Sequence, residues 1–215
     1  MAAPSRQLRS VLVPSGSAHL EGELALPEQT HGVVLFAHGS GSSRFSPRNT
    51  RVARVLNEAG IGTLLFDLLT REEDRDYASR FGIGLLTDRL LAATDWLAGE
   101  AACTQLKTGY FGASTGAAAA LRAAAGRAAI AAVVSRGGRP DLAGVSALEM
   151  VKAPTLLLVG GRDEAVIELN EQALSRLTCV KDLVIIPGAT HLFEEPGALD
   201  QVAAHAARWF RRWLE

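Results

Sequence analysis

The hydrophobic residues divide most of the chain into short apolar runs separated by longer amphipathic stretches. The runs cover residues 33–37, 62–66, 108–111, 131–135, 155–159 and 183–186. Runs that are apolar at nearly every position are typical of strands buried on both faces, because helices cover both sides of a parallel sheet. We therefore expect these segments to be the strands of one mostly parallel sheet.

The stretches between the runs carry helical spacing and helix start signals. Ser46 followed by Pro47 offers an N-cap and a proline at the first helical position, which predicts a helix over 47–59. The other predicted helices cover 82–97, 115–125, 170–177 and 198–214. Alternating strands and helices predict an α/β fold with helices on both faces of the sheet.

The N-terminal part has a different pattern. Residues 8–13 and 19–26 are strand-like, the second with alternating apolar and polar positions, and a turn at 14–17 separates them. This arrangement predicts an antiparallel hairpin at the edge of the sheet. Because 215 residues suit one hydrophobic core, we expect a single domain over 1–215.

The composition argues against some classes of binding partner. The formal net charge is −1 with both signs mixed along the chain, which argues against nucleic acid or an anionic membrane surface as a partner. Residues 1–12 lack the basic head and apolar run of a signal peptide, so a cytoplasmic location is expected. Cys103 and Cys179 show neither metal-ligand spacing nor a disulfide framework and are expected to be free thiols.

The sharpest chemical motif is Gly-Ala-Ser-Thr-Gly at residues 112–116, between an apolar run and an alanine-rich helical stretch. Strand, Gly-x-Ser-x-Gly turn and helix are the setting of a nucleophile elbow, in which the serine accepts strained dihedrals to project its hydroxyl. A plain glycine-flanked turn is the alternative. The setting favours Ser114 as a nucleophile.

A serine nucleophile needs a base and an acid that orients the base. His191 follows the run 183–186, and Asp163 follows the run 155–159, which gives the order serine, acid, histidine. Glu164 competes with Asp163 as the acid, and a helix cap is the alternative role for either. Asp67 also follows a strand but precedes Ser114, so we interpret it as a loop anchor.

The oxyanion of such a reaction needs two backbone N–H donors. We expect one from Thr115, directly after the nucleophile. The other is expected from Ser40, in the small-residue loop 38–43 after the run 33–37. His38 is expected to order this loop by hydrogen bonding.

Together, His38-Gly39, the turn at 112–116, Gly161-Arg-Asp163 and Gly188-Ala-Thr-His191 resemble the α/β-hydrolase superfamily, and the compact length resembles its dienelactone-hydrolase-like branch. Dienelactone hydrolases use a cysteine nucleophile, whereas position 114 is serine, so the resemblance implies a general carboxylic-ester hydrolase. The stretch 136–153 is short where lidded members carry an insertion, which implies no large lid.

These observations predict a serine esterase that acts on small or medium esters through an acyl-enzyme, with no cofactor and no metal. A thioesterase, an amidase or peptidase, and a non-catalytic module on the same fold are the alternatives. We expect a small-molecule ester as the partner and a monomer or homodimer. Arginines that follow strands could select an anionic substrate or could be solvated loop residues, namely Arg44, Arg48, Arg136 and Arg139.

Overall fold

The computed structural model describes residues 6–215; residues 1–5, which belong to the expected domain and to the N-terminal segment considered above, lie outside the described residues. Within this part of the chain the strands form one sheet in the order β1-β2-β4-β3-β5-β6-β7-β8. Their bounds are β1 Arg6–Ser15, β2 Ala18–Pro27, β3 Gly32–Ala37, β4 Gly62–Phe66, β5 Lys107–Ala113, β6 Ile130–Arg136, β7 Thr155–Gly160 and β8 Lys181–Ile186.

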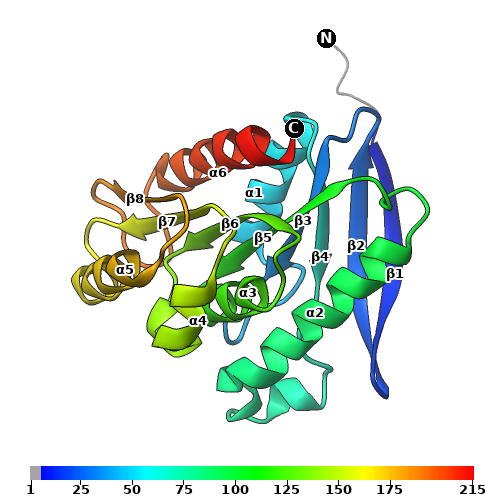
Figure 1. Ribbon diagram of the computed structural model, residues 1–215, viewed down its shortest axis with the longest axis horizontal. Coiled ribbons are helices and arrows are strands. Elements are labelled where there is room, and N and C mark those ends of the chain that lie inside the picture. Colours follow the sequence, from blue (N-terminus) through cyan, green and yellow to red (C-terminus); the bar gives the residue numbers. More distant parts are fainter. Residues whose placement is uncertain (1–5) are drawn as a thin grey trace.

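The sheet is parallel from β4 to β8 and antiparallel at its N-terminal edge. β1 pairs with β2, and β2 pairs with β4, in antiparallel register. The hairpin therefore extends one edge of the sheet, as the blue strands of Figure 1 show. The expected mostly parallel sheet with an antiparallel N-terminal hairpin is confirmed.

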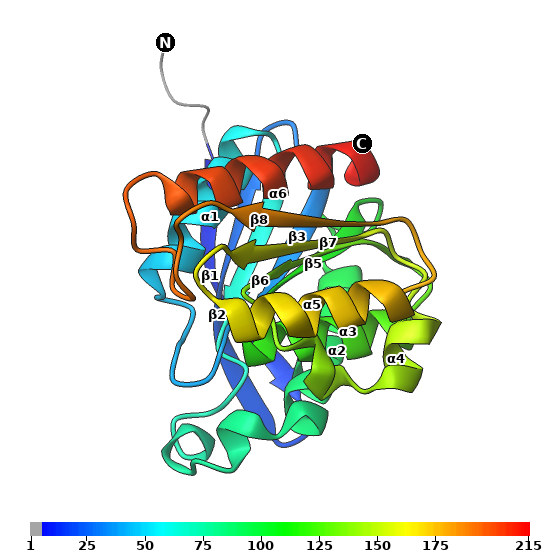
Figure 2. The ribbon, with the colours of Figure 1, turned by 90° about the vertical axis from the view of Figure 1, so that its left-hand side faces the viewer.

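Helices cover both faces of the sheet (Figure 2). α1 (Pro47–Glu58) and α6 (Ala198–Leu214) lie together on one face. The opposite face carries α2 (Ile83–Gly99), α3 (Thr115–Ala125), α4 (Val145–Met150) and α5 (Glu164–Arg176). Short 3-10 helices lie at Glu73–Arg75, Ser79–Phe81 and Pro140–Ala143.

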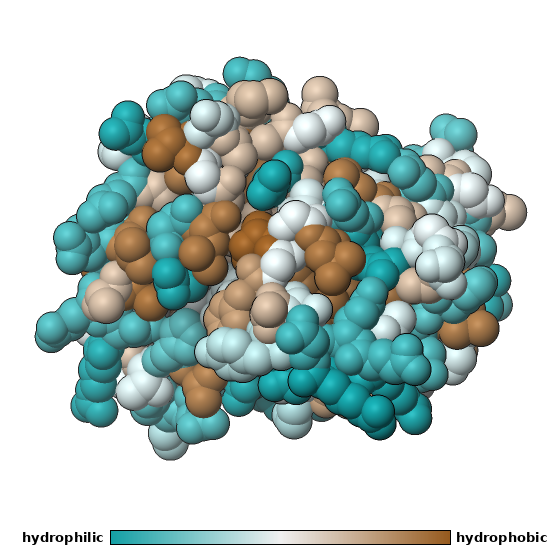
Figure 3. All heavy atoms as spheres, turned by 90° about the horizontal axis from the view of Figure 1, so that it is seen from below, coloured by the Kyte–Doolittle hydropathy of each residue, from teal (hydrophilic) through white to brown (hydrophobic). Residues whose placement is uncertain are grey.

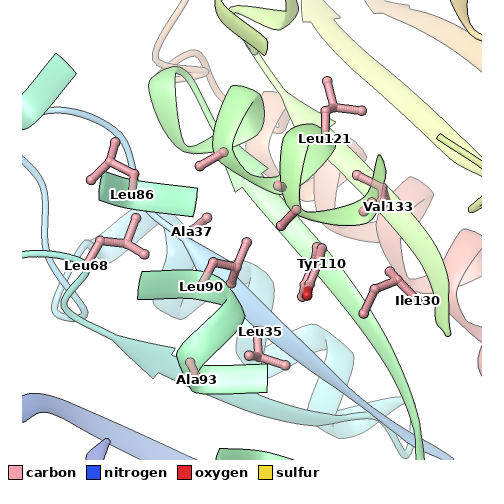
Figure 4. Packing of buried hydrophobic residues seen from close by; sticks show 14 of the residues in the cluster. Leu35, Ala37, Leu68, Leu86, Leu90, Ala93, Tyr110, Leu121, Ile130 and Val133 are labelled. Atoms are coloured by element: carbon pink, nitrogen blue, oxygen red, sulfur yellow. The ribbon is translucent and has the colours of Figure 1, made fainter. Parts of the chain in front are cut away.

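Each helix layer seals its own hydrophobic cluster against the sheet. On the α2/α3 side, Leu86 and Leu90 of α2 pack with Leu35 and Tyr110 of the central strands (Figure 4). On the α1/α6 side, Phe36 and Phe111 pack with their ring centroids 4.8 Å apart. Side chains of one strand alternate between the two clusters, so both faces of the central strands are buried.

Two helical segments differ from the prediction. α5 begins at Glu164, although helical spacing places its start at 170. α4 has no counterpart among the predicted helices because it has only 6 residues and begins after Gly144, which supplies no capping side chain. With the adjacent 3-10 helix, α4 occupies the segment between β6 and β7, where a large lid was not expected.

The surface mixes polar and apolar side chains. Figure 3 shows the face seen from below, with apolar residues near its centre and hydrophilic residues around them. Across residues 6–215, no helix combines the length and the apolar character that crossing a bilayer requires. Cys103 and Cys179 are both free thiols, as predicted.

Candidate active site

Ser114 occupies a strained turn between β5 and α3. Its φ of 50° and ψ of −121° lie in a backbone region that residues other than glycine rarely adopt, at a cost of about 1–3 kcal/mol. A Cβ at Gly112 would lie 2.4 Å from Ala117 Cα, and one at Gly116 would lie 2.1 Å from the Ala37 carbonyl oxygen. The turn can form only because both flanking residues lack a side chain.

Backbone hydrogen bonds hold this turn on two sides. The Ser114 N–H donates to the Arg136 carbonyl over 3.2 Å, at the end of the neighbouring strand β6. The Ser114 carbonyl accepts from the Ala117 N–H over 3.1 Å and from the Arg139 N–H over 3.2 Å. The strained conformation is therefore fixed by the surrounding backbone.

Asp163 and His191 are hydrogen-bonded to each other. The Asp163 Oδ2 atom lies 2.6 Å from His191 Nδ1, across 28 residues of sequence. Asp163 stands at the N-cap position of α5, yet its side chain makes no capping hydrogen bond. Glu164, the competing acid, is exposed and begins the helix. The structure thus brings Asp163 to the imidazole and leaves its neighbour in solvent.

The loop that carries His191 reaches the strand ends beside Ser114. A Cβ built on Gly137 would lie 3.6 Å from His191 Cε1 and 3.3 Å from the His191 carbonyl oxygen. Gly137 directly follows Arg136, whose carbonyl binds the Ser114 amide. Within residues 6–215, the Ser114 hydroxyl makes no hydrogen bond to His191. In unliganded sites such contacts often tighten only when substrate binds.

The loop after β3 is ordered by His38, as predicted. The buried imidazole pairs through Nδ1 with the Gly39 carbonyl over 3.0 Å and accepts the Leu68 N–H at Nε2 over 3.0 Å. Burial lowers the pKa of His38, against the opposing effects of the Gly39 carbonyl and of Asp67 and Asp74. His38 is therefore a neutral structural residue that joins the loops after β3 and β4.

The two expected oxyanion donors lie next to each other. The Ser40 N–H donates to Thr115 Oγ1 over 2.9 Å, so this amide has a partner already. The Thr115 N–H stands at the first position of α3, where a helix leaves its donors without an internal acceptor. The Thr115 hydroxyl therefore connects the loop after β3 to the turn at Ser114, a role that the sequence motif did not predict.

Arg44 and Arg139 have carboxylate partners. The Arg44 guanidinium pairs with Asp67 and Glu21, and its backbone N–H donates to Asp67 over 2.7 Å. Asp67 thus anchors the β3 loop, as interpreted from the sequence. Arg139 pairs with Asp141 over 2.7 Å. These contacts give both arginines structural partners, so the substrate-binding hypothesis rests on Arg48 and Arg136.

Arg136 is buried without such a partner. The residue is 8% exposed, and its Nε and Nη1 atoms have no hydrogen-bond acceptor. Burial and, secondarily, the charge of Arg48 lower the pKa of Arg136 to about 10. Its guanidinium carbon lies 5.9 Å from the centroid of the Phe193 ring. Phe193, which sequence reasoning did not identify, adopts a φ of 55° two residues after His191.

Residues 20–215 match the profile of the dienelactone hydrolase family. A dienelactone hydrolase from Anabaena variabilis has a similar structure, with a TM-score of 0.94 and 58% identity over 98% of this chain and 99% of that chain. The esterase Est1E from Butyrivibrio proteoclasticus matches with a TM-score of 0.81 and 18% identity over 94% and 98% of the two chains, a likeness of fold alone.

A protein of Mycobacterium tuberculosis named "putative phosphoribosyl transferase" is 56% identical over 97% of this chain and 47% of its own length. The chain therefore spans about half the length of this curated relative.

Proposed function

Because the chain belongs to the dienelactone hydrolase family, we propose that it hydrolyses carboxylic esters with Ser114 as nucleophile, His191 as general base and Asp163 as the acid that orients the imidazole. The 2.6 Å contact between Asp163 and His191, beside a serine in an elbow conformation, carries the proposal. An acid bound to Nδ1 fixes the tautomer in which Nε2 accepts a proton.

In the proposed reaction, Ser114 Oγ attacks the ester carbonyl carbon while its proton passes to His191 Nε2. The tetrahedral intermediate collapses, and His191 returns the proton to the leaving alcohol oxygen. Water then attacks the acyl-enzyme, its proton passes to His191, and the acid product leaves as Ser114 Oγ regains a proton. No metal and no organic cofactor takes part in this scheme.

The oxyanion is proposed to bind the N–H groups of Thr115 and Ser40. The Thr115 amide is free in helix geometry, and the positive end of α3 points the same way. The Ser40 N–H donates to the Thr115 hydroxyl, so substrate must share or replace this hydrogen bond.

The name of the longer mycobacterial relative does not change this proposal. That chain is about twice as long, and the half aligned here has the fold of esterases. We therefore propose ester hydrolysis for this chain rather than phosphoribosyl transfer. A thioesterase or amidase would use the same residues, and a substrate panel of matched esters, thioesters and amides separates these outcomes.

The experiment is Ser114→Ala assayed with 4-nitrophenyl acetate, together with labelling by a fluorophosphonate. We expect a loss of about a thousandfold or more in rate, the scale for removing a nucleophile, and no label at position 114. Ser175→Ala, at an exposed position of α5, is the control and should keep both activity and label. Full activity in Ser114→Ala would refute the assignment, and an unlabelled, inactive wild type would favour a non-catalytic module.

A further inference from the structure

Arg136 lies where the end of β6 meets the proposed catalytic residues. Its carbonyl binds the Ser114 amide over 3.2 Å, and its side chain lies on the α1/α6 face, alternating with Ser135. Phe193 stands 5.9 Å from its guanidinium carbon, in the loop that carries His191. The guanidinium of Arg136 therefore lies against the loop that carries His191.

This charge has no counter-ion among residues 6–215. The residue is 8% exposed, and neither Nε nor Nη1 has an acceptor. Arg89, which is also 8% exposed, differs from it: Arg89 pairs with Glu73 over 2.6 Å and donates to the Ser15 carbonyl over 2.7 Å. The Nε atom of Arg89 also lacks an acceptor, but its charge is balanced by Glu73, whereas a buried arginine with no carboxylate partner is costly.

A second cation lies near the first, since Arg48 pairs with Glu194, the residue that follows Phe193. Arg48, near the N-terminus of α1, is close enough for its charge to lower the pKa of Arg136. The Nε atom of Arg48 is buried without an acceptor, and its only carboxylate among the described residues is Glu194, at 3.6 Å and 67% exposed on its side chain. Two like charges close together are stabilised by an anion, whereas water satisfies the N–H groups without neutralising the charge.

The guanidinium groups of Arg136 and Arg48 favour an oxyanion as their ligand. A guanidinium presents a planar fork of donors that matches the oxygens of a carboxylate or a phosphate group. The N-terminus of the 12-residue helix α1, where Arg48 is the second residue, adds positive potential in the same place. A neutral group would leave the charge of Arg136 without a counter-ion.

We propose that Arg136 and Arg48 form a subsite that binds an anionic group, a carboxylate or a phosphate, of the substrate whose ester bond reacts at Ser114. The identity of that group as part of an ester substrate rests on the proposed function. Binding of the anion itself does not, and can be measured without turnover.

The binding experiment uses benzoate, phenyl phosphate and neutral benzamide in calorimetric titrations of Ser114→Ala in chloride buffer of constant ionic strength. We expect at least one anion to bind about tenfold or more tightly than benzamide, and the tighter of the two identifies carboxylate or phosphate. Arg136→Gln and Arg48→Gln should each weaken anion binding about tenfold, Arg136→Lys should recover part of it, and Arg54→Gln on the same helix should change nothing. Equal affinity for all three compounds, or unchanged binding in Arg136→Gln, would overturn the proposal.

The kinetic experiment compares 4-methylphenyl acetate with 4-acetoxybenzoate and 4-acetoxyphenyl phosphate. The ratio of kcat/KM for an anionic ester to that for the neutral ester should fall about tenfold in Arg136→Gln relative to wild type and stay constant in Arg54→Gln. If the neutral ester is hydrolysed and the ratio does not move, the subsite is wrong and the hydrolase stands. If no ester is hydrolysed but anions bind through Arg136, the hydrolase is wrong and the subsite stands.

Discussion

Asp163 accepts the Nδ1 hydrogen bond of His191 over 2.6 Å, although it occupies the first position outside α5, where a carboxylate ordinarily caps the helix. The carboxylate makes no capping hydrogen bond and binds the imidazole instead. A capping bond stabilises a helix by about 1 kcal/mol, which this arrangement forgoes. The choice of partner is what an orienting acid requires.

Asp163→Asn should therefore lower kcat by about 10⁴-fold with little change in fold, because an amide favours the wrong imidazole tautomer. The matched control is Glu164→Gln, one residue later and exposed, which should keep activity within about twofold. Both variants are measured with the same neutral ester and checked by circular dichroism. A larger loss in Glu164→Gln than in Asp163→Asn would reverse the assignment of the acid.

The elbow should be intolerant of a single methyl group. In Gly116→Ala, the new Cβ would lie 2.1 Å from the Ala37 carbonyl oxygen, so β3 and α3 must separate. We expect a loss of about 1–3 kcal/mol in the free energy of unfolding, which corresponds to about 2–12 °C in Tm for a chain of this size, together with loss of activity.

The control for this substitution is Gly126→Ala, at the end of the same helix. There the nearest atom is 3.7 Å away and φ is −85°, so alanine fits without strain. Its Tm should equal or slightly exceed that of the wild type. A Gly116→Ala protein as stable as Gly126→Ala would mean that the elbow does not pack against β3 as described.

A feature can be predicted from the sequence when the residues that indicate it are close together along the chain. The elbow at Ser114 combines its strand, glycines and helix within a few residues, and the structure places it there. The pairing of Arg44 with Glu21 and Asp67 could not be predicted, because Glu21 lies in β2 and Asp67 directly follows β4, and both meet Arg44 only in the folded chain. The start of α5 at Glu164 was missed although Asp163, at the N-cap position, is a residue type that commonly precedes a helix.

His38 should make stability depend on pH. Burial lowers the pKa of His38 in the folded protein, whereas the unfolded chain takes up a proton near the ordinary value of 6.5. Below that pH the unfolded state binds the extra proton, so the free energy of unfolding falls, with a slope that approaches about 1.4 kcal/mol per pH unit. This stability is fully present above pH 6.5 and is lost as the pH falls toward the lowered pKa.

The measurement is urea unfolding of the wild type and of His38→Gln between pH 7.5 and about 5, above the range where most carboxylates titrate. Glutamine can still accept the Leu68 N–H, and the slope should flatten. His205→Gln is the comparison, since burial and Arg208 also lower the pKa of His205, which is less enclosed. If both variants keep the wild-type slope, His38 is not the group that titrates.

Arg136 should lower the stability of the folded protein. Its buried charge lacks an acceptor for Nε and Nη1, and burial lowers its pKa to about 10. Replacing a buried, poorly compensated charge by an apolar side chain of similar length is often stabilising, so Arg136→Met should raise the free energy of unfolding by about 1–4 kcal/mol.

Arg89→Met is the matched comparison because Arg89 is equally buried but bonded to Glu73 and Ser15. It should lower stability by about 1–3 kcal/mol. Both are measured by urea unfolding in chloride buffer, since phosphate bound at Arg136 would stabilise the wild type and hide the gain. Opposite signs for the two arginines are the expected result. A loss of stability in Arg136→Met would show that the folded protein already compensates this charge, and would remove the physical reason for an anion beside Ser114.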